Sequence, residues 1–127
     1  MSELYDAALA KVKEYRGQEA KLGGGPMGEL APEVEKLKDE LLWGQIWTDP
    51  SIDIATRSLC TISALMVMDL EEQLANHCRW AKHLGVSDEA LISLATQMMV
   101  YGGLPRGHNA IRVVKSVIAE SAEQPIR

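Results

Sequence analysis

The chain has 127 residues, of which 46% are hydrophobic, and a formal net charge of −5 at pH 7. A chain of this length forms one domain that buries roughly two thirds of its unfolded surface, and its hydrophobic fraction excludes a disordered protein. Its acidic balance, with no run of Lys or Arg, argues against nucleic acid or an anionic membrane as partner. No apolar stretch approaches the roughly 18 residues of a membrane span. We therefore expect a cytoplasmic protein.

The first part of the chain predicts a helix followed by a linker. Ala, Leu, Glu, Lys and Met dominate the whole sequence, and the apolar residues from about Glu3 to Glu19 repeat at helical spacing. Gly23-Gly24-Gly25-Pro26 cannot continue a helix, because each Gly costs about 1 kcal/mol and Pro about 3 kcal/mol. Residues 1–25 are therefore interpreted as an N-terminal helix with a Gly-rich linker, and residues 31–120 as the helical core of a single domain over residues 1–127.

The core pattern predicts five further helices, which gives an all-α protein of about six helices. Pro32 suits a first helical turn, Gly85 a left-handed C-terminal cap, and Ser87 an N-terminal cap. The predicted ranges run from Pro32 to before Asp49-Pro50, from Ile54 to about Met68, from about Leu70 to Leu84, from Asp88 to Gly102-Gly103, and from Pro105 to about Glu120.

Apolar residues are too numerous for a lone six-helix monomer. A monomer would leave a large apolar surface exposed. This surface would come from Trp43, Trp47, the Met-rich helix before Gly102 and the helix after Asp53, which is apolar on most sides. Such surfaces are typical of contacts between subunits. We therefore expect a homo-oligomer.

The two cysteines do not predict a metal or redox site. Cys60 and Cys78 lie 18 residues apart, without the C-x-x-C spacing of zinc sites and redox pairs. The simplest interpretation is two buried single cysteines. A disulfide between Cys60 and Cys78 is the alternative interpretation.

Several segments resemble one family in order and in spacing. They are Leu42-Trp43-Gly44-Gln45-Ile46-Trp47 with Asp49-Pro50, Thr56-Arg57-Ser58-Leu59-Cys60-Thr61-Ile62, Glu71-Glu72-Gln73-Leu74-Ala75-Asn76-His77, Gly85-Val86 with Asp88-Glu89, and Val100-Tyr101-Gly102-Gly103-Leu104-Pro105 with Asn109-Ala110. Over about 75 residues from Trp43 the chain resembles the carboxymuconolactone decarboxylase family. Tyr5, Leu9 and Gly17 extend the resemblance to the family's N-terminal helix.

This resemblance implies an AhpD-like helical bundle that oligomerises, as a hexamer or trimer, with the active site against a subunit interface. The implied activity removes CO2 from a carboxylated γ-lactone in protocatechuate breakdown and leaves the enol-lactone of 3-oxoadipate. The conjugated lactone carbonyl is itself the electron sink, so the resemblance implies no metal and no organic cofactor. The protein has to hold oxyanions and deliver a proton to carbon.

Three residues are the candidates for catalysis. His77 stands where the family has its histidine and is the leading acid/base, with a core histidine as the alternative. Arg57, in an apolar helix, needs a partner, which is either the substrate carboxylate or an acid such as Glu71 or Glu72. Glu71 matches a family acid and is interpreted either as a relay to His77 or as a solvated residue at the start of a helix.

The corner around Gly102 is the candidate for substrate binding. Gly102, with Tyr101 and Leu104, belongs to a helix–turn–helix corner whose backbone N–H groups can hold an oxyanion. Arg106 and His108 replace the small residues that the family prefers after its proline, and they lie either at the pocket or on the surface. Trp43 completes the predicted binding set.

Gln73 also departs from the family pattern, because it occupies the position of an acid four residues before the histidine. An amide can hydrogen-bond but cannot shuttle a proton. The second interpretation is therefore a family relative that decarboxylates, isomerises or cyclises another lactone or β-keto acid. An alkylhydroperoxidase-like thiol reductase and a non-catalytic oligomeric binder are further alternatives, and the missing C-x-x-C weighs against the first.

Overall fold

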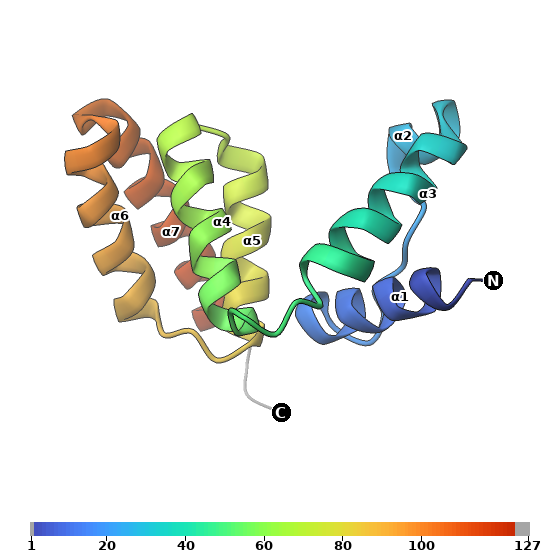
Figure 1. Cartoon of the computed structure of the whole chain (residues 1–127). Coiled ribbons are helices and arrows are strands. Elements are labelled where there is room, and N and C mark those ends of the chain that lie inside the picture. The colour runs from blue at the N-terminus through green and yellow to red at the C-terminus, as the bar shows by residue number, and fades with distance from the viewer. Residues whose placement is uncertain (1, 124–127) are drawn as a thin grey trace. The chain divides into compact units, whose positions relative to one another are not determined.

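The computed structural model describes residues 2–123, and the helices that it shows confirm the all-α prediction. The chain divides into two compact units, one ending at Ile54 and the other beginning at Ala55. Each unit is a set of packed helices with no β-strand among the described residues. Figure 1 shows their order along the chain.

The first unit contains three α-helices and one π-helical turn. They are α1 (Glu3–Arg16), α2 (Gly25–Leu30), α3 (Pro32–Leu41) and the turn η1 (Leu42–Ile46). Helix α1 packs against α3 and η1, and α2 packs against α3. Ser2 caps α1, because its Oγ accepts a hydrogen bond from the Tyr5 N–H at 3.1 Å. Ala8, Val12 and Tyr15, on one face of α1, are fully buried.

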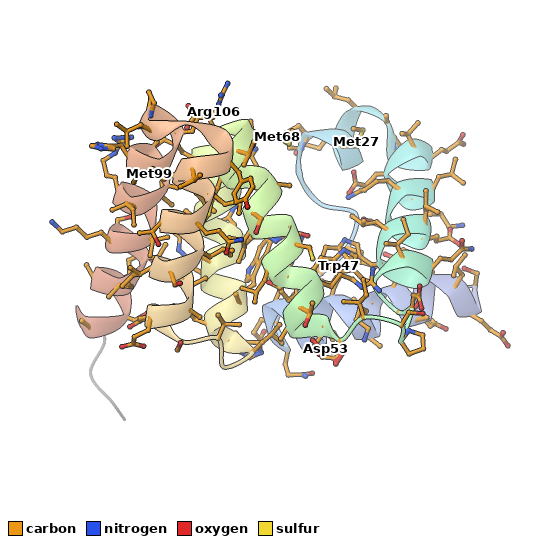
Figure 2. All side chains as sticks on the ribbon, turned by 60° about the vertical axis from the view of Figure 1, so that its left-hand side comes forward. Met27, Trp47, Asp53, Met68, Met99 and Arg106 are labelled. Atoms are coloured by element: carbon orange, nitrogen blue, oxygen red, sulfur yellow. The ribbon has the colours of Figure 1, made fainter. Side chains whose placement is uncertain are left out.

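Helix α2 was not predicted, since the glycine-rich stretch was interpreted as linker. Pro26 lies in the first turn of α2, where its missing N–H removes no helical hydrogen bond. Its fixed φ angle favours the helical conformation, so the segment that cannot continue a helix can begin one. The exposed Met27 of Figure 2 lies on this helix. The helix predicted from Pro32 ends as η1, in which the Trp47 N–H donates to the Leu42 carbonyl at 2.8 Å.

The second unit is a bundle of four helices, α4 (Ile54–Met68), α5 (Glu71–His83), α6 (Asp88–Gly102) and α7 (Leu104–Glu123). In Figure 1, α4 and α6 run from one end of the unit to the other, and α5 and α7 run back in the opposite direction. Helix α7 packs against both α5 and α6. Figure 2 shows Met68, at the end of α4, and Arg106, in the first turns of α7, at the same end of this unit.

The core of the second unit consists of small and medium apolar side chains from all four helices. These helices match the predicted ranges to within a few residues, and Ser87 caps α6 as expected, accepting from the Ala90 N–H at 3.0 Å. The buried core residues are Ile62, Met66, Leu74, Cys78, Ala81, Leu91, Ala95, Ala110, Val113, Val114 and Val117.

Candidate functional site

His77 lies half-buried on α5, on the side of that helix that points away from α7. Its ring stands edge-on to the Trp80 indole, with 4.8 Å between ring centroids and an interplanar angle of 73°. Glu71 and Arg79, also on α5, both pair with residues of α7. His77 is about 120° from Glu71 around the helix axis and about 160° from Arg79. The imidazole therefore packs against an aromatic neighbour on the flank of α5 that does not contact α7.

Gln73 lies one turn before His77 on the same flank of α5, about 40° away around the axis. Its side chain is exposed. A residue at this position is a neighbour of His77 on the helix surface, which is where the family pattern has an acid.

Glu71, interpreted either as a relay to His77 or as a solvated residue at the start of a helix, lies at the start of α5 and pairs with α7. Its Oε1 lies 2.7 Å from Nη2 of Arg112. The bonded guanidinium and the turn of the helix both direct this carboxylate away from the imidazole. Glu72 is exposed at the start of α5.

Arg57 lies one turn inside α4, and its Nε is buried. Helices α4 and α5 are antiparallel, joined by the short turn at Asp69 and Leu70. Measured along the axes from this turn, Arg57 is about 16 Å away and His77 about 9 Å. The two residues thus differ by about 7 Å in their positions along the bundle axis.

The predicted binding corner connects α6 to α7. Gly103 has a φ angle of 101°, which favours glycine, and this residue ends α6. Nη1 of Arg106 donates to the Gly102 carbonyl at 3.2 Å, so this side chain caps the last turn of α6. The side chains of Tyr101 and Leu104 are 76% and 58% exposed.

A hollow of about 430 Å³ opens beside this corner, on the outer surface of α7. It is lined by the predicted residues Leu104 and His108 and by Pro105. Asn109 and Arg112, which were not predicted as site residues, complete the lining. Leu104, His108 and Arg112 follow each other at intervals of four residues. That spacing places them on one face of a helix and could have indicated the hollow.

Trp43, the remaining predicted binding residue, lies in the first unit and is 2% exposed. Its ring centroid is 5.8 Å from that of Tyr15 and 4.9 Å from that of Trp47. The Arg16 guanidinium lies over the indole, 4.9 Å from the ring centroid. These contacts make Trp43 part of an aromatic core, and its role in substrate binding stays a prediction.

Charged side chains gather next to this aromatic core. The buried Asp39 accepts from the Gly23 N–H at 3.2 Å and from the Lys38 ammonium at 2.8 Å, and Lys38 also pairs with Glu35 at 2.7 Å. Burial lowers the pKa of Lys38, but its hydrogen bonds to Asp39 and Glu35 outweigh burial and raise the pKa above its ordinary value. Burial lowers the pKa of Arg16. The network anchors the glycine-rich segment to α3.

Both cysteines are free thiols, so the alternative of a disulfide between them is not realised. Cys78 is buried as predicted, whereas Cys60 is exposed, so the prediction of two buried cysteines is wrong for Cys60. Burial raises the pKa of the Cys78 thiol to about 12. A thiol that remains protonated at neutral pH is a poor nucleophile. The cysteine next to His77 is therefore a core residue.

Metal-binding clusters and membrane-spanning helices are both absent from residues 2–123. In this range no three or more His, Cys, Asp or Glu side chains gather in a way that could bind a metal ion. None of the described helices is both long and apolar enough to cross a membrane.

The fold and the site define an all-helical protein with a half-buried histidine on α5, a half-buried arginine on α4, and a hollow at one helical corner. The sequence pattern of the carboxymuconolactone decarboxylase family matches residues 32–116. The chain belongs to this family.

Three relatives give the range of similarity. The chain is 31% identical over 99 residues to 4-carboxymuconolactone decarboxylase of Acinetobacter baylyi, covering 78% of this chain and 74% of the relative. It is 31% identical over 100 residues to an uncharacterized 15.0 kDa protein of Paracoccus denitrificans, covering 77% and 75%. It is 27% identical over 90 residues to nitrosuccinic acid decarboxylase of Metarhizium robertsii, covering 71% and 63%.

Proposed function

We propose that the protein is a cofactor-independent carboxy-lyase that removes CO2 from a carboxylated γ-lactone and releases the enol-lactone of 3-oxoadipate. The observation that carries this proposal is the 31% identity with a 4-carboxymuconolactone decarboxylase over 78% of the chain. Family membership and two relatives named as decarboxylases support the general reaction class.

The substrate of this reaction provides the electron sink. The bond between the γ-carbon and the carboxylate breaks, and its electron pair forms a ring double bond next to the γ-carbon. The former ring double bond shifts its electrons through the α-carbon onto the lactone carbonyl. The resulting enolate then takes up one proton at the α-carbon. The protein must therefore supply a proton donor, a site for the substrate carboxylates and protection from water.

His77 is assigned as the proton donor, and Arg57 as the group that binds a carboxylate. An imidazole exchanges protons near neutral pH, and its ring is positioned here by the Trp80 indole. The buried Nε of Arg57 restrains a guanidinium whose separation from His77 along the bundle is about 7 Å.

Subunit association is part of the proposal. Val100 and Tyr101 expose 81% and 76% of their surface near the end of α6, and Met68, at the same end of the second unit, exposes 62%. Exposed apolar side chains grouped in this way are typical of contact surfaces. We therefore infer a homo-oligomer, which the family resemblance implies to be a hexamer or a trimer, and light scattering of the purified protein would test the number of subunits.

A second candidate is a family relative that acts on a different carboxylated substrate. Gln73 lies on the same flank as His77 in place of the family acid, and the similarity to nitrosuccinic acid decarboxylase shows that named activities differ among the relatives. A thiol reductase is disfavoured, because burial raises the pKa of Cys78 to about 12.

The deciding experiment measures CO2 release from 4-carboxymuconolactone by the wild type, His77→Ala and His83→Ala. His83 is an exposed histidine at the end of α5 and is therefore the matched control. We expect His77→Ala to lose about 10²- to 10⁴-fold in kcat and His83→Ala to stay within about twofold of the wild type. Full activity of His77→Ala would remove this residue from the reaction.

The same assay distinguishes the two candidates. A wild type that releases no CO2 from the lactone but does so from nitrosuccinate, with the same dependence on His77, supports the second candidate. Arg106→Ala adds a test of the corner. A large increase in KM would place Arg106 at the substrate, and an unchanged KM would leave it as a cap of α6.

A further inference from the structure

Four polar side chains form a chain of hydrogen bonds beside the hollow on α7. Nδ2 of Asn109 donates to both carboxylate oxygens of Asp69, at 3.0 and 3.2 Å. This leaves the Asn109 Oδ1 as an acceptor for Arg112, whose Nη2 and Nη1 donate to it at 3.1 and 3.3 Å. Nη2 of Arg112 also donates to Glu71 Oε1 at 2.7 Å. The guanidinium is thus fixed from two sides before any ligand arrives.

Asp69 lies in the turn between α4 and α5 with a φ angle of 61°, a left-handed conformation that Asp tolerates better than most residues. Its two bonds to Asn109 tie this turn to α7. The position of Arg112 therefore depends on three segments, which are the α4–α5 turn, the start of α5 and α7 itself. A surface arginine with this support loses little side-chain freedom when it binds a ligand.

The held guanidinium still has donors to offer. Among residues 2–123, the acceptors for Arg112 are Glu71 and Asn109, so that Nε–H and one N–H of Nη1 have no acceptor there. His108 has no hydrogen-bond partner within the same residues and lies one turn before Arg112 on α7. Residues at this spacing have their Cβ atoms about 6 Å apart, which a carboxylate can bridge.

The hollow also has an apolar part. Leu104 and Pro105 line this open hollow of about 430 Å³ together with His108, Asn109 and Arg112. An apolar wall next to oriented donors is the arrangement that binds the body and the charged end of a small anion.

The hollow is distinct from the flank that carries His77. Arg112 is bonded to Glu71, and Glu71 lies about 120° from His77 around α5 and about 9 Å from it along the axis. Within one chain, helix α5 therefore lies between Arg112 and His77. A ligand in the hollow therefore does not occupy the place of a substrate that receives a proton from His77.

We propose that the hollow lined by Leu104, Pro105, His108, Asn109 and Arg112 is a second ligand site, which binds a small organic carboxylate with a short apolar body. Arg112 and His108 donate to the carboxylate, and Leu104 and Pro105 contact the apolar part. The same chemistry fits a product of the reaction or a separate effector. This site does not depend on the proposed decarboxylase activity.

The test is an NMR titration of the ¹⁵N-labelled full chain with sodium benzoate, and with benzamide as its uncharged counterpart. We expect benzoate to shift the Arg112 Nε–H signal and the backbone amides of residues 104–112, whereas benzamide leaves them in place. Arg112→Gln should weaken benzoate binding about tenfold or more, and His108→Ala about threefold. Arg79→Gln, which breaks the other ion pair between α5 and α7, is the matched control and should bind like the wild type.

The possible results separate this proposal from the proposed function. Unchanged benzoate affinity in His77→Ala, together with the loss in Arg112→Gln, supports a distinct site. Equal affinity in the wild type and Arg112→Gln, or no shift at residues 104–112, overturns it. Affinity that falls in His77→Ala but not in Arg112→Gln would place benzoate at the catalytic flank, which refutes the second site while the decarboxylase proposal stands. Product and effector are distinguished by adding the product of the CO2 assay in place of benzoate. If the product binds and its affinity depends on Arg112, the product is the ligand of this site. If benzoate binds but the product does not, the ligand is a separate effector.

Discussion

Gly107 is the residue at which one added methyl group tests the packing of the α6–α7 corner most directly. It is buried in α7 against Met99, which Figure 2 shows on α6. A Cβ atom at Gly107 would lie 2.6 Å from the Cβ and Cγ of Met99 and 2.8 Å from its Cα. Carbon atoms ordinarily approach to about 3.5–4.0 Å. Two of these Met99 atoms cannot move by side-chain rotation, so the two helices have to separate by about 1 Å.

Two effects of opposite sign set the magnitude for Gly107→Ala. Alanine favours a helix over glycine by about 1 kcal/mol, whereas forcing extra volume into a packed contact costs about 1–3 kcal/mol. Because the contact is to backbone and Cβ atoms, we expect the upper part of that cost and a net loss of about 1–2 kcal/mol in the free energy of unfolding. Urea denaturation followed by circular dichroism measures this as a midpoint lowered by about 1 M or less.

Gly102→Ala is the matched control for this reasoning. A Cβ atom there would lie 3.0 Å from Cγ2 and 3.3 Å from Cα of Val67, so a shift of a few tenths of an ångström accommodates it. We expect its free energy of unfolding to stay within about 0.5 kcal/mol of the wild type. A Gly107→Ala variant as stable as the wild type, or less affected than Gly102→Ala, would refute the argument from contact distances.

Two further predictions concern pH. Burial raises the pKa of the Cys78 thiol from 9.0 to about 12, so the stability due to its protonated form is complete below pH 9 and is lost as pH rises toward 12. Between pH 8 and 10.5, the free energy of unfolding measured in urea should therefore fall more steeply for the wild type than for Cys78→Ala, by up to about 1.4 kcal/mol per pH unit. Equal slopes for the two proteins would contradict this prediction. The hydrogen bond from Arg79 lowers the pKa of the exposed Glu120 below 4.5, so the stabilising effect of this ion pair is present above pH 4.5 and is lost as pH falls. Between pH 6 and 3, the Tm of the wild type should therefore drop further than the Tm of Glu120→Gln. Parallel curves of Tm against pH would show that the ion pair does not form in solution.

Helical periodicity and caps could be predicted from the sequence because they depend on neighbours along the chain. The helix from Ile54 to Met68 has the predicted ends, and Ser87 caps the following helix as its residue type suggests. Helix α2 was missed because the same Gly-Pro pair that breaks one helix starts another. The π-helical turn at Leu42 has no distinct signal in composition, since it differs from an α-helix only by the partner of a few hydrogen bonds.

Partners across helices could not be predicted in the same way. The position of His77 came from the family resemblance, and the rotation of α5 then determined its neighbours. Glu71 was considered as a partner of His77 or of Arg57, but its bonded cation is Arg112, 41 residues away in sequence. Neither sequence spacing nor residue type distinguishes His77, Arg57 and Arg112 as partners of Glu71, because all three side chains can carry a positive charge and a suitable fold can bring any of them close to Glu71. The two units are each defined by their own contacts, and a single domain over residues 1–127 stays a prediction.

The contacts between α5 and α7 define the flank of α5 on which His77 lies. Glu71 pairs with Arg112, and Arg79 pairs with Glu120, so the two bonds are spaced by eight residues on both helices. Equal spacing in the same direction means that α5 and α7 run parallel and in register over about 12 Å. Exposed ion pairs of this kind add little stability. The two pairs nevertheless show which side of α5 faces α7, and the His77 side chain lies on the opposite flank of that helix.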